Sequence, residues 1–206
     1  RGDDLDVIFT GEGYCPSELI PQERDGLEGK ADMPNAVRFD QQDWVWDILQ
    51  NDHGPKAAPI AQSMQTRAPV HLRVNVARTT LSGATKSLAE EAIITAPHKL
   101  AATALEVRDG APRITASRTF QDGLVELQDA ASQAIVEALG DLHDTDVLDY
   151  CAGGGGKALA MAAAGARVTA HDIDQKRMRD IPVRADRAKI NIKIASEVTE
   201  KYDIVL

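Results

Sequence analysis

The chain has 206 residues, of which 43% are hydrophobic and 27% charged; this is ordinary usage for a globular protein and enough length for more than one domain. No apolar run approaches the ~20 residues of a membrane span, and the first residues do not have the pattern of a signal peptide. Cys15 and Cys151 are the only cysteines, so a disulfide framework and a cysteine metal site are excluded and a reducing cytoplasm is expected.

The formal net charge of −9 is concentrated in the first part of the chain. Residues 1–60 hold 13 acidic and 5 basic side chains, whereas residues 61–140 hold 8 of each and residues 141–206 hold 11 and 10. The later part therefore neither indicates nor forbids a surface that binds phosphate groups.

Residues 1–66 are expected to form an acidic segment that is mostly helical or irregular. The sequence begins without a methionine, which indicates an N-terminal truncation. Trp44 and Ile48 share one face of a predicted short helix. The favoured interpretation is that this helix packs its tryptophans against a neighbouring domain, and stacking of the tryptophans on nucleic-acid bases is the alternative.

Residues 67–122 are expected to form a small α+β module. Apolar residues alternate with polar ones over 70–76, which predicts a strand with one buried face. Ser82 is expected to cap the helix that follows, and Pro97 to stop it from continuing. Further strands are predicted at 104–107 and 113–115, separated by an Asp-Gly turn.

Residues 146–174 organise the last region, 123–206. Val147 and Leu148 predict a strand, the four glycines that follow predict a loop, and the alanines of 158–164 predict a helix. A second predicted strand, over 166–170, is followed by Asp172. This order is typical of the first β-α-β unit of an open parallel sheet, where an acidic residue after the second strand can accept both hydroxyls of a ribose. The sequence therefore predicts a ligand that carries a nucleoside.

The glycines alone do not identify that ligand. Gly153, Gly155 and Ala158 also fit the loose G-x-G-x-x-A pattern of NAD-binding folds. A phosphate-cradling P-loop is excluded, because its first glycine would fall on Cys151. Further along, a basic run at 176–189 is interpreted as a solvated helix face, with contact to an RNA backbone as the alternative, and two more strands are predicted at 190–195 and 202–206.

Residues 149–158, Asp-Tyr-Cys-Ala-Gly-Gly-Gly-Gly-Lys-Ala, resemble motif I of the RNA (cytosine-5) methyltransferases, usually written D-x-C-A-A-P-G-G-K-T. Gly153 and Gly154 stand in place of the usual Ala-Pro, and Ala158 in place of Thr. Residues 123–133 resemble the family's G-x-x-x-x-Q-D-x-x-S-Q block, and their helical spacing predicts an amphipathic helix over 124–139.

The strand segment Leu-Arg-Val-Asn at 72–75 also resembles a strand that precedes the catalytic domain in this family. Two interpretations stay open for Arg73 and Asn75: an exposed sheet face, or a contact with RNA or with another domain.

The resemblance to the bacterial Sun/NOL1-type 16S rRNA (cytosine-5) methyltransferases implies an α/β fold. The expected architecture is a truncated, Rossmann-like, S-adenosylmethionine-dependent methyltransferase sheet over 123–206, preceded by an RNA-positioning α+β module and the N-terminal segment. The resemblance implies S-adenosylmethionine as the cofactor, ribosomal RNA as the partner, and neither a membrane nor a metal. The cofactor-binding residues that it implies are Cys151, Ala152, Gly153, Gly154, Gly155, Gly156, Lys157, Asp172, Ile173 and Arg177.

In this family one cysteine attacks C6 of the target cytosine and a second helps to release the product. Both positions are expected beyond Leu206, so no catalytic residue is expected in this chain, and the chain alone is expected to be inactive. Two other function classes stay open: an NAD-dependent oxidoreductase, and a non-catalytic module that binds cofactor or RNA. The five histidines, at 53, 71, 98, 143 and 171, show no ligand spacing and are interpreted as structural or solvated.

Overall fold

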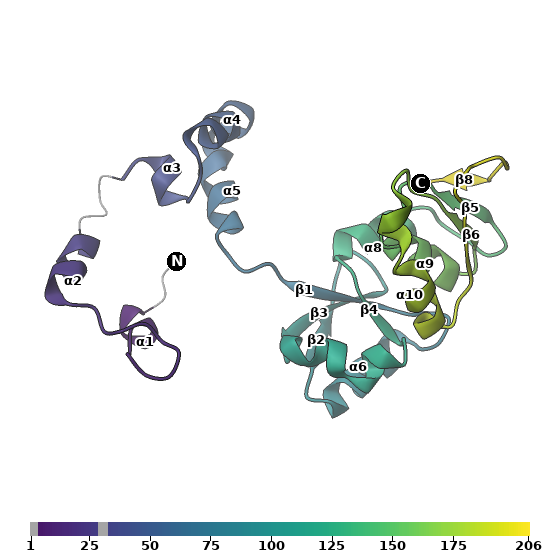
Figure 1. Cartoon of the computed structure of the whole chain (residues 1–206), viewed down its shortest axis with the longest axis horizontal. Helices are drawn as coiled ribbons and strands as arrows, with labels where there is room; N and C mark the ends of the chain where they lie inside the picture. Colours follow the sequence, from purple (N-terminus) through teal and green to yellow (C-terminus); the bar gives the residue numbers. More distant parts are fainter. Residues whose placement is uncertain (1–3, 29–32) are drawn as a thin grey trace. The chain divides into compact units, whose positions relative to one another are not determined.

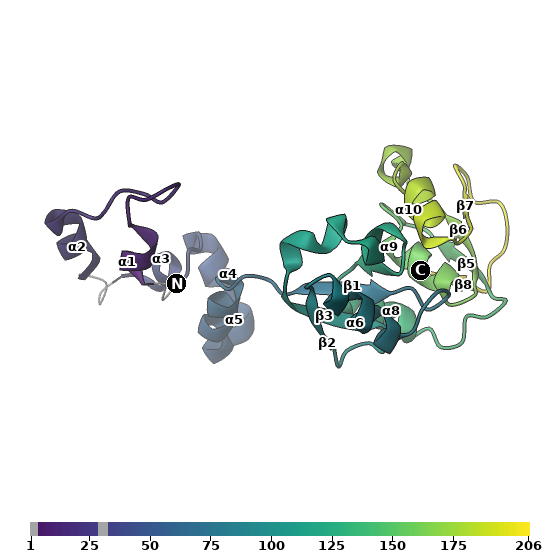
Figure 2. The ribbon, with the colours of Figure 1, turned by 90° about the horizontal axis from the view of Figure 1, so that it is seen from below.

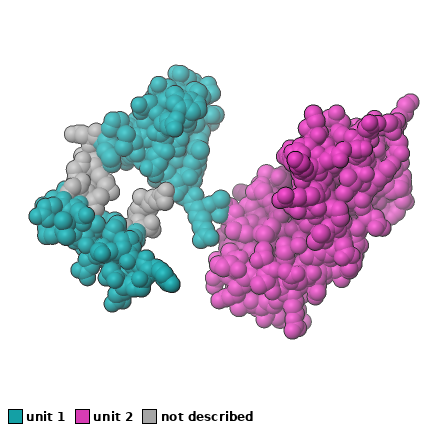
Figure 3. Space-filling view, viewed as in Figure 1, with its two compact units in different colours: residues 1–68 teal, residues 69–206 magenta. Residues whose placement is uncertain are grey.

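The computed structural model describes residues 4–28 and 33–206. The chain divides into two compact units, Arg1–Ala68 and Pro69–Leu206, which Figure 3 shows in teal and magenta. In the part of the chain that is described, no helix is long and apolar enough to cross a membrane. The division predicted from the sequence, at 66/67 and 122/123, stays a prediction.

The first unit is helical in its described residues. Its helices are α1 (Leu5–Ile8), α2 (Pro21–Glu28), α3 (Asn35–Arg38), α4 (Asp43–His53), the 3-10 helix η2 (Gly54–Lys56) and α5 (Ala57–Met64). The predicted tryptophan helix is α4. Trp46 is buried and stacks on Phe39 with ring centroids 5.3 Å apart, whereas Trp44 is 61% exposed. Trp46 thus packs within its own unit, and the packing of these tryptophans against a neighbouring domain stays a prediction.

The second unit begins with an antiparallel sheet in the order β2-β3-β1-β4 (Figure 1). Its elements in chain order are β1 (Val70–Val74), α6 (Leu81–Glu90), β2 (Ile94–Pro97), β3 (Ala104–Asp109), the 3-10 helix η3 (Ala111–Ala116), α7 (Arg118–Gln121) and β4 (Val125–Leu127). The elements follow one another as β-α-β-β-α-β. This order, with the strands arranged as above, is the ferredoxin-like fold. The expected α+β module is thus present.

Three predictions within this sheet are wrong. Thr80, not Ser82, caps α6, since the Thr80 hydroxyl accepts the Gly83 amide at 3.1 Å. Pro97 does not limit α6, which ends at Glu90; it is the last residue of β2. Residues 113–115 lie in η3 rather than in a strand, because Gly110 takes a left-handed conformation at the end of β3 and turns the chain away.

A second, parallel sheet follows, in the order β7-β6-β5-β8. Its elements are β5 (Asp146–Asp149), α9 (Gly156–Ala163), β6 (Arg167–Ala170), the 3-10 helix η4 (Gln175–Met178), α10 (Ile181–Ala188), β7 (Ile192–Ile194) and β8 (Ile204–Val205). Figure 2 shows α9 and α10 beside this sheet, and they pack on one another. The predicted strand–loop–helix–strand unit and the Rossmann-like parallel sheet are confirmed.

Helix α8 (Ala130–Glu137) connects the two sheets along the chain, and its start differs from the prediction. Residues 125–127 form β4, so the expected helix over 124–139 begins six residues late. Asp129 caps α8, because its Oδ1 accepts the Ala131 amide at 2.8 Å. The sheet pairing of β4 with β1 overrides the helical spacing that residues 124–128 share with α8.

Side chains of β1 and of the residue that follows it fix the first sheet against the helices of the second. Asn75 donates to the carbonyl oxygens of Gly123 at 2.9 Å and of Ala188 at 2.8 Å. Arg73 donates to the Gln128 side chain at 2.5 Å and to the Gly156 carbonyl at 2.6 Å. Both Arg73 and Asn75 are buried, so the interpretation of an exposed sheet face is wrong; both side chains instead contact residues of the region 123–206.

A buried carboxylate adds to this junction. Glu126, on β4, accepts from Arg187 at 2.7 Å and from Arg184 at 3.4 Å, and the Arg187 guanidinium also lies 4.0 Å from the centroid of the Phe120 ring. Burial lowers the pKa of Arg73 to about 10, against the opposing charge of Glu126, so Arg73 stays charged at neutral pH. Paired charges of this kind hold the two sheets in one fixed arrangement.

Candidate cofactor site

The candidate site lies at the carboxyl ends of β5 and β6. These strands pair in parallel, with Asp149 opposite Ala170, so the loops that leave them lie at the same edge of the sheet. The first loop is the run of glycines, and the second contains Asp172. Ligands of open α/β sheets bind in the crevice at this edge, which makes it the expected place for a nucleoside-bearing ligand.

The glycine loop needs glycine at specific points. Gly153 and Gly155 have φ angles of 51° and 78°, in the left-handed region that favours glycine. A Cβ atom at Gly155 would also lie 2.7 Å from Cγ1 of Ile181. Gly155 is the N-cap of α9, and among the described residues no side chain caps this helix. The amides of its first turn are therefore available to a ligand.

Asp172 ties the second loop to the first. Its carboxylate, only 1% exposed, accepts the Gly153 amide at 2.9 Å and the Asp174 amide at 3.0 Å. The Arg177 guanidinium lies 3.4 Å from the same carboxylate. The Asp174 amide, followed by the Gly153 amide and the Arg177 charge, lowers the pKa of Asp172, so the group is an ionised acceptor at neutral pH.

Asp149 is a feature of the site that the sequence reasoning did not assign. It is the last residue of β5 and is buried, and its Oδ2 atom has no hydrogen-bond partner in the described part of the chain. Burial raises the pKa of Asp149, against the opposing charge of Lys157. A buried carboxylate oxygen without a partner, close to the start of α9, is a position that a donor group of a ligand can complete. The sequence signal that could have identified Asp149 was its position as the acidic residue directly before the glycine loop.

The structure brings the other implied residues to the same edge, with different exposure. Cys151 is exposed, and the amide of buried Ala152 donates to the His171 carbonyl at 2.9 Å. The Gly154 carbonyl accepts from Arg184. Ile173 is 96% exposed, so its side chain is open to a flat apolar group.

The contact between Tyr150 and His171 near the loop was missed from the sequence; their rings lie 5.0 Å apart. Gln128 also approaches the loop, since a Cβ added at Gly156 would lie 3.3 Å from its Nε2 atom. Gln128 belongs to the block at 123–133, which the resemblance to the methyltransferase family implies to lie near the cofactor.

The basic run is divided between inward and outward side chains. Arg184 and Arg187 are engaged with Glu126, and Arg177 with Asp172. The side chains of Lys176, Arg179 and Lys189 are exposed, whereas those of Arg184 and Arg187 turn inward, so the interpretation of one solvated helix face is wrong for the arginines of α10.

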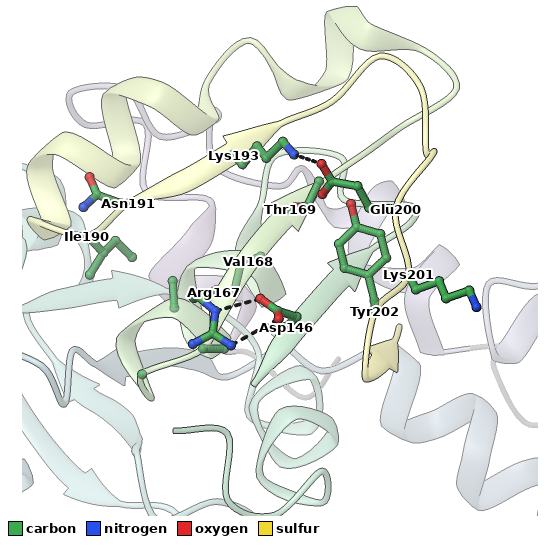
Figure 4. A pocket seen from close by; sticks show the side chains of 13 residues that line it. Asp146, Arg167, Val168, Thr169, Ile190, Asn191, Lys193, Glu200, Lys201 and Tyr202 are labelled. Carbon is green, nitrogen blue, oxygen red and sulfur yellow. Dashed lines mark hydrogen bonds and ion pairs between the residues drawn. The ribbon is translucent and has the colours of Figure 1, made fainter. Parts of the chain in front are cut away.

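A separate cavity of about 780 Å³ lies at the opposite edge of the second sheet (Figure 4). Asp146 and Arg167, the first residues of β5 and β6, form an ion pair of 2.7 Å at its wall, and Lys193 pairs with Glu200 at 2.7 Å. The residues that line it include none of the implied cofactor-binding residues. Since ligands of such sheets bind at the carboxyl ends of the strands, this cavity is not the candidate site.

A ferredoxin-like sheet joined to a parallel, Rossmann-like sheet with a glycine loop and an acidic residue after its second strand defines the α/β class of this chain. Solved structures share this fold, two of them from Pyrococcus horikoshii. The chain superposes on a methyltransferase homolog protein from Pyrococcus horikoshii with a TM-score of 0.71 and 22% identity, covering 87% of this chain and 57% of that one. It also superposes on NSun6 from Pyrococcus horikoshii with SFG, with a TM-score of 0.67 and 14% identity, covering 76% of this chain and 65% of that one.

Sequence comparison narrows the class. Residues 41–112 match the family described as "Methyltr_RsmF/B-like, ferredoxin-like domain". The protein named ribosomal RNA small subunit methyltransferase B of Vibrio cholerae is 26% identical over 84% of this chain and 40% of its own length, and its namesake from Citrobacter koseri is 31% identical over 70% and 34%. The chain is thus similar over most of its length to proteins named ribosomal RNA small subunit methyltransferase B, and it spans 40% or less of the length of these curated relatives.

Proposed function

We propose that this chain is the cofactor-binding part of an S-adenosylmethionine-dependent RNA (cytosine-5) methyltransferase that acts on ribosomal RNA in the cytoplasm. The observation that carries the proposal is the glycine loop held by Asp172 at the carboxyl ends of β5 and β6. The proposal is also supported by the similarity of most of this chain to proteins that are named ribosomal RNA methyltransferases.

The residues at this edge fit S-adenosylmethionine. Two left-handed glycines and the uncapped first turn of α9 suit a ligand that approaches the backbone closely. The unpartnered Asp149 oxygen suits a donor group of the ligand, and Asp172 is an ionised acceptor. When bound, this cofactor supplies an electrophilic methyl group.

Each implied residue has a proposed role. The run from Cys151 to Lys157 holds the methionine part, Asp172 accepts from the ribose hydroxyls, and Ile173 lies against the adenine. A carboxylate offers about four acceptor positions, so Asp172 can bond a ribose while it keeps its two amides. Arg177 lies over this carboxylate with its side chain 61% exposed, and it moves aside when the ribose binds.

The RNA is proposed to contact the outward-facing basic side chains of the second unit, such as Lys176 and Arg179, which are exposed. Neither cysteine of the chain is proposed as the nucleophile that attacks cytosine. Cys151 lies in the glycine loop on the cofactor side, and Cys15 belongs to the first unit. A thiolate nucleophile must instead reach a base turned out of its stack.

Calorimetry with S-adenosylhomocysteine and with NAD in parallel tests the proposal. The expected result is saturable binding of S-adenosylhomocysteine with one site per chain and no binding of NAD. Binding of NAD alone would overturn the methyltransferase assignment in favour of an oxidoreductase, and binding of neither would remove the cofactor site. The variant Asp180→Ala, an exposed acid outside the loop, is the control for nonspecific change.

A further inference from the structure

Three potential metal ligands from separate strands meet on one face of the first sheet. His71 lies on β1 directly opposite Glu106 on β3, and Glu106 is in turn opposite Ala96 on β2. His98 is two residues beyond Ala96, so it belongs to the same face. One ligand atom of His71, one of His98 and one of Glu106 all lie within 4.8 Å of one another. Strand pairing alone brings them together, which is why the sequence shows no ligand spacing.

His71 is the side chain that indicates a missing ligand. It is buried, and its Nε2 atom has no hydrogen-bond partner within the described ranges. A buried nitrogen without a partner is destabilising and needs a physical explanation, which a bound group would supply. The His98 ring centroid lies 4.8 Å from that of His71 at an interplanar angle of 56°, which is not a stacked pair that would explain the arrangement.

The other nitrogen of His71 is oriented by a carboxylate. Nδ1 lies 3.2 Å from Oδ2 of Asp129, the N-cap residue of α8. A carboxylate only accepts, so this contact puts the proton on Nδ1 and leaves the lone pair on Nε2. The Ala130 amide lies 3.3 Å from the same Nδ1 atom and would favour the other tautomer, but the hydrogen bond to the charged carboxylate is the stronger of the two and sets the tautomer. A carboxylate behind a histidine is the usual outer shell of a metal-bound imidazole.

From this arrangement we propose that His71, His98 and Glu106 bind a divalent transition metal ion, Zn²⁺ by its donor set. Two imidazoles and one carboxylate are a common set of three protein ligands for zinc, with water in the fourth position. Ligands of a tetrahedral ion with bonds of about 2.0–2.1 Å stand roughly 3.4 Å apart, so the three side chains close in slightly on binding. This proposal is independent of the cofactor site.

One ion pair competes with the metal. Arg108 lies 2.9 Å from the Glu106 carboxylate, but its side chain is 57% exposed. An exposed pair of this kind contributes little, so Glu106 can exchange Arg108 for a metal ion. Removal of Arg108 is therefore expected to raise zinc affinity, which a purely structural role for Glu106 would not predict.

The test is metal binding by the whole chain, without an affinity tag and after removal of metals with a chelator. Calorimetry with Zn²⁺ is expected to give one site per chain. Co²⁺ in its place is expected to give the visible absorption of a tetrahedral site, without the thiolate charge-transfer band that Cys15 or Cys151 would produce. Absence of zinc binding by the folded chain overturns the proposal.

Variants assign the ligands. His98 and Glu106 are only partly buried, so His98→Asn and Glu106→Gln can be measured even if His71→Asn does not fold. Asp129→Asn is expected to weaken zinc binding by about 10-fold to 100-fold. Each of the two ligand variants is expected to weaken it more than that. Asparagine keeps the cap of α8. The exposed control His143→Asn should bind as the parent does. Unchanged affinity in both His98→Asn and Glu106→Gln, with circular dichroism unchanged, would show that the metal binds elsewhere.

Discussion

Asp172 illustrates how one buried carboxylate can serve both folding and binding. It already accepts two backbone amides, and the proposed ribose would use its remaining acceptor positions. A hydrogen bond to a charged acceptor accounts for roughly a 10-fold to 150-fold effect on affinity. We therefore expect Asp172→Ala to weaken binding of S-adenosylhomocysteine by that factor in calorimetry. A change of less than twofold in a folded variant would contradict the ribose role.

The protonation of Asp172 gives a pH prediction at the same scale. The pKa of Asp172 in the folded chain is lowered from its ordinary value of 3.8. Its ionised carboxylate therefore contributes to ligand binding at every pH above 3.8, and this contribution is lost only when the pH falls through the lower pKa of the folded chain. Affinity for S-adenosylhomocysteine should thus stay constant between pH 8 and about pH 5, measured by titration at each pH. An Asp172-dependent decline already near pH 6 would contradict an ionised buried acceptor.

Among the elements, α7 depends on a side chain outside it. Glu91 accepts the Arg118 amide at 2.6 Å, and the Thr119 amide at 2.9 Å and hydroxyl at 2.6 Å, at the start of this four-residue helix. Loss of such a cap costs about 1–2 kcal/mol. We expect Glu91→Ala to lower the free energy of unfolding by that amount in urea titrations at pH 7.

The same cap has an acid limit. Although burial alone would raise the pKa of Glu91, the hydrogen bonds from Thr119 and Arg118 lower it from 4.5. A lowered folded pKa means that the stabilisation is present above the unfolded value and is lost as pH falls through the folded one. The difference between the parent and Glu91→Ala should shrink below about pH 4. An equal difference at pH 3 and pH 7 would assign it to packing.

In the first unit, Trp46 and Trp44 are a matched pair on one helix. Trp46 packs with Phe39, Ala57 and Ala61, whereas Trp44 faces solvent. Truncation of a buried aromatic side chain costs about 3–5 kcal/mol, and truncation of an exposed one much less. Trp46→Ala should therefore abolish the helical signal of this unit in thermal melts, and Trp44→Ala should leave it in place.

The sequence predicts a helix or strand correctly where its local pattern favours one structure only, and fails where two structures fit the same pattern. Strands β5 and β6 and the glycine loop were predicted because apolar runs, glycines and alanines follow in a fixed order. Strand β4 was missed because Leu124 and Gln128 continue the helical spacing of α8, and only pairing with β1 reveals the strand. Thr80 and Ser82 are equally good caps, so the choice between them is made by the end of the preceding turn.

The site follows the same logic. Asp172 and the glycines were predictable because a β-α-β unit brings its loops together by rule. The burial of Asp149 could not be predicted, and neither could the inward turn of the arginines toward Glu126. Both depend on which face of α10 packs on β4. The meeting of His71, His98 and Glu106 depends on strand register, which the sequence did not provide.

At the scale of the whole second unit, Gly123 is a close contact between the two sheets. It has a φ of 68°, and an added Cβ would lie 2.0 Å from the Arg187 carbonyl oxygen. Gly140 has a φ of 82° with no described atom within 4 Å of that position. We expect Gly140→Ala to cost about 1–2 kcal/mol, for its backbone conformation alone. Gly123→Ala should cost several kcal/mol more in urea titrations, because backbone must move. Equal costs would mean that the sheets are not held in contact there.

The side-chain bonds of Asn75 also have a consequence for how the protein is made. Their acceptors, the carbonyls of Gly123 and Ala188, lie 48 and 113 residues further along the chain. Contacts over such separations form late, since a long loop must close first. A ribosome that has synthesised β1, β2 and β3 thus carries a sheet without its edge strand and with a polar amide that nothing yet satisfies. The nascent chain stays open to chaperones and proteases until α10 has emerged, and slower translation between residues 123 and 188 would prolong that exposure.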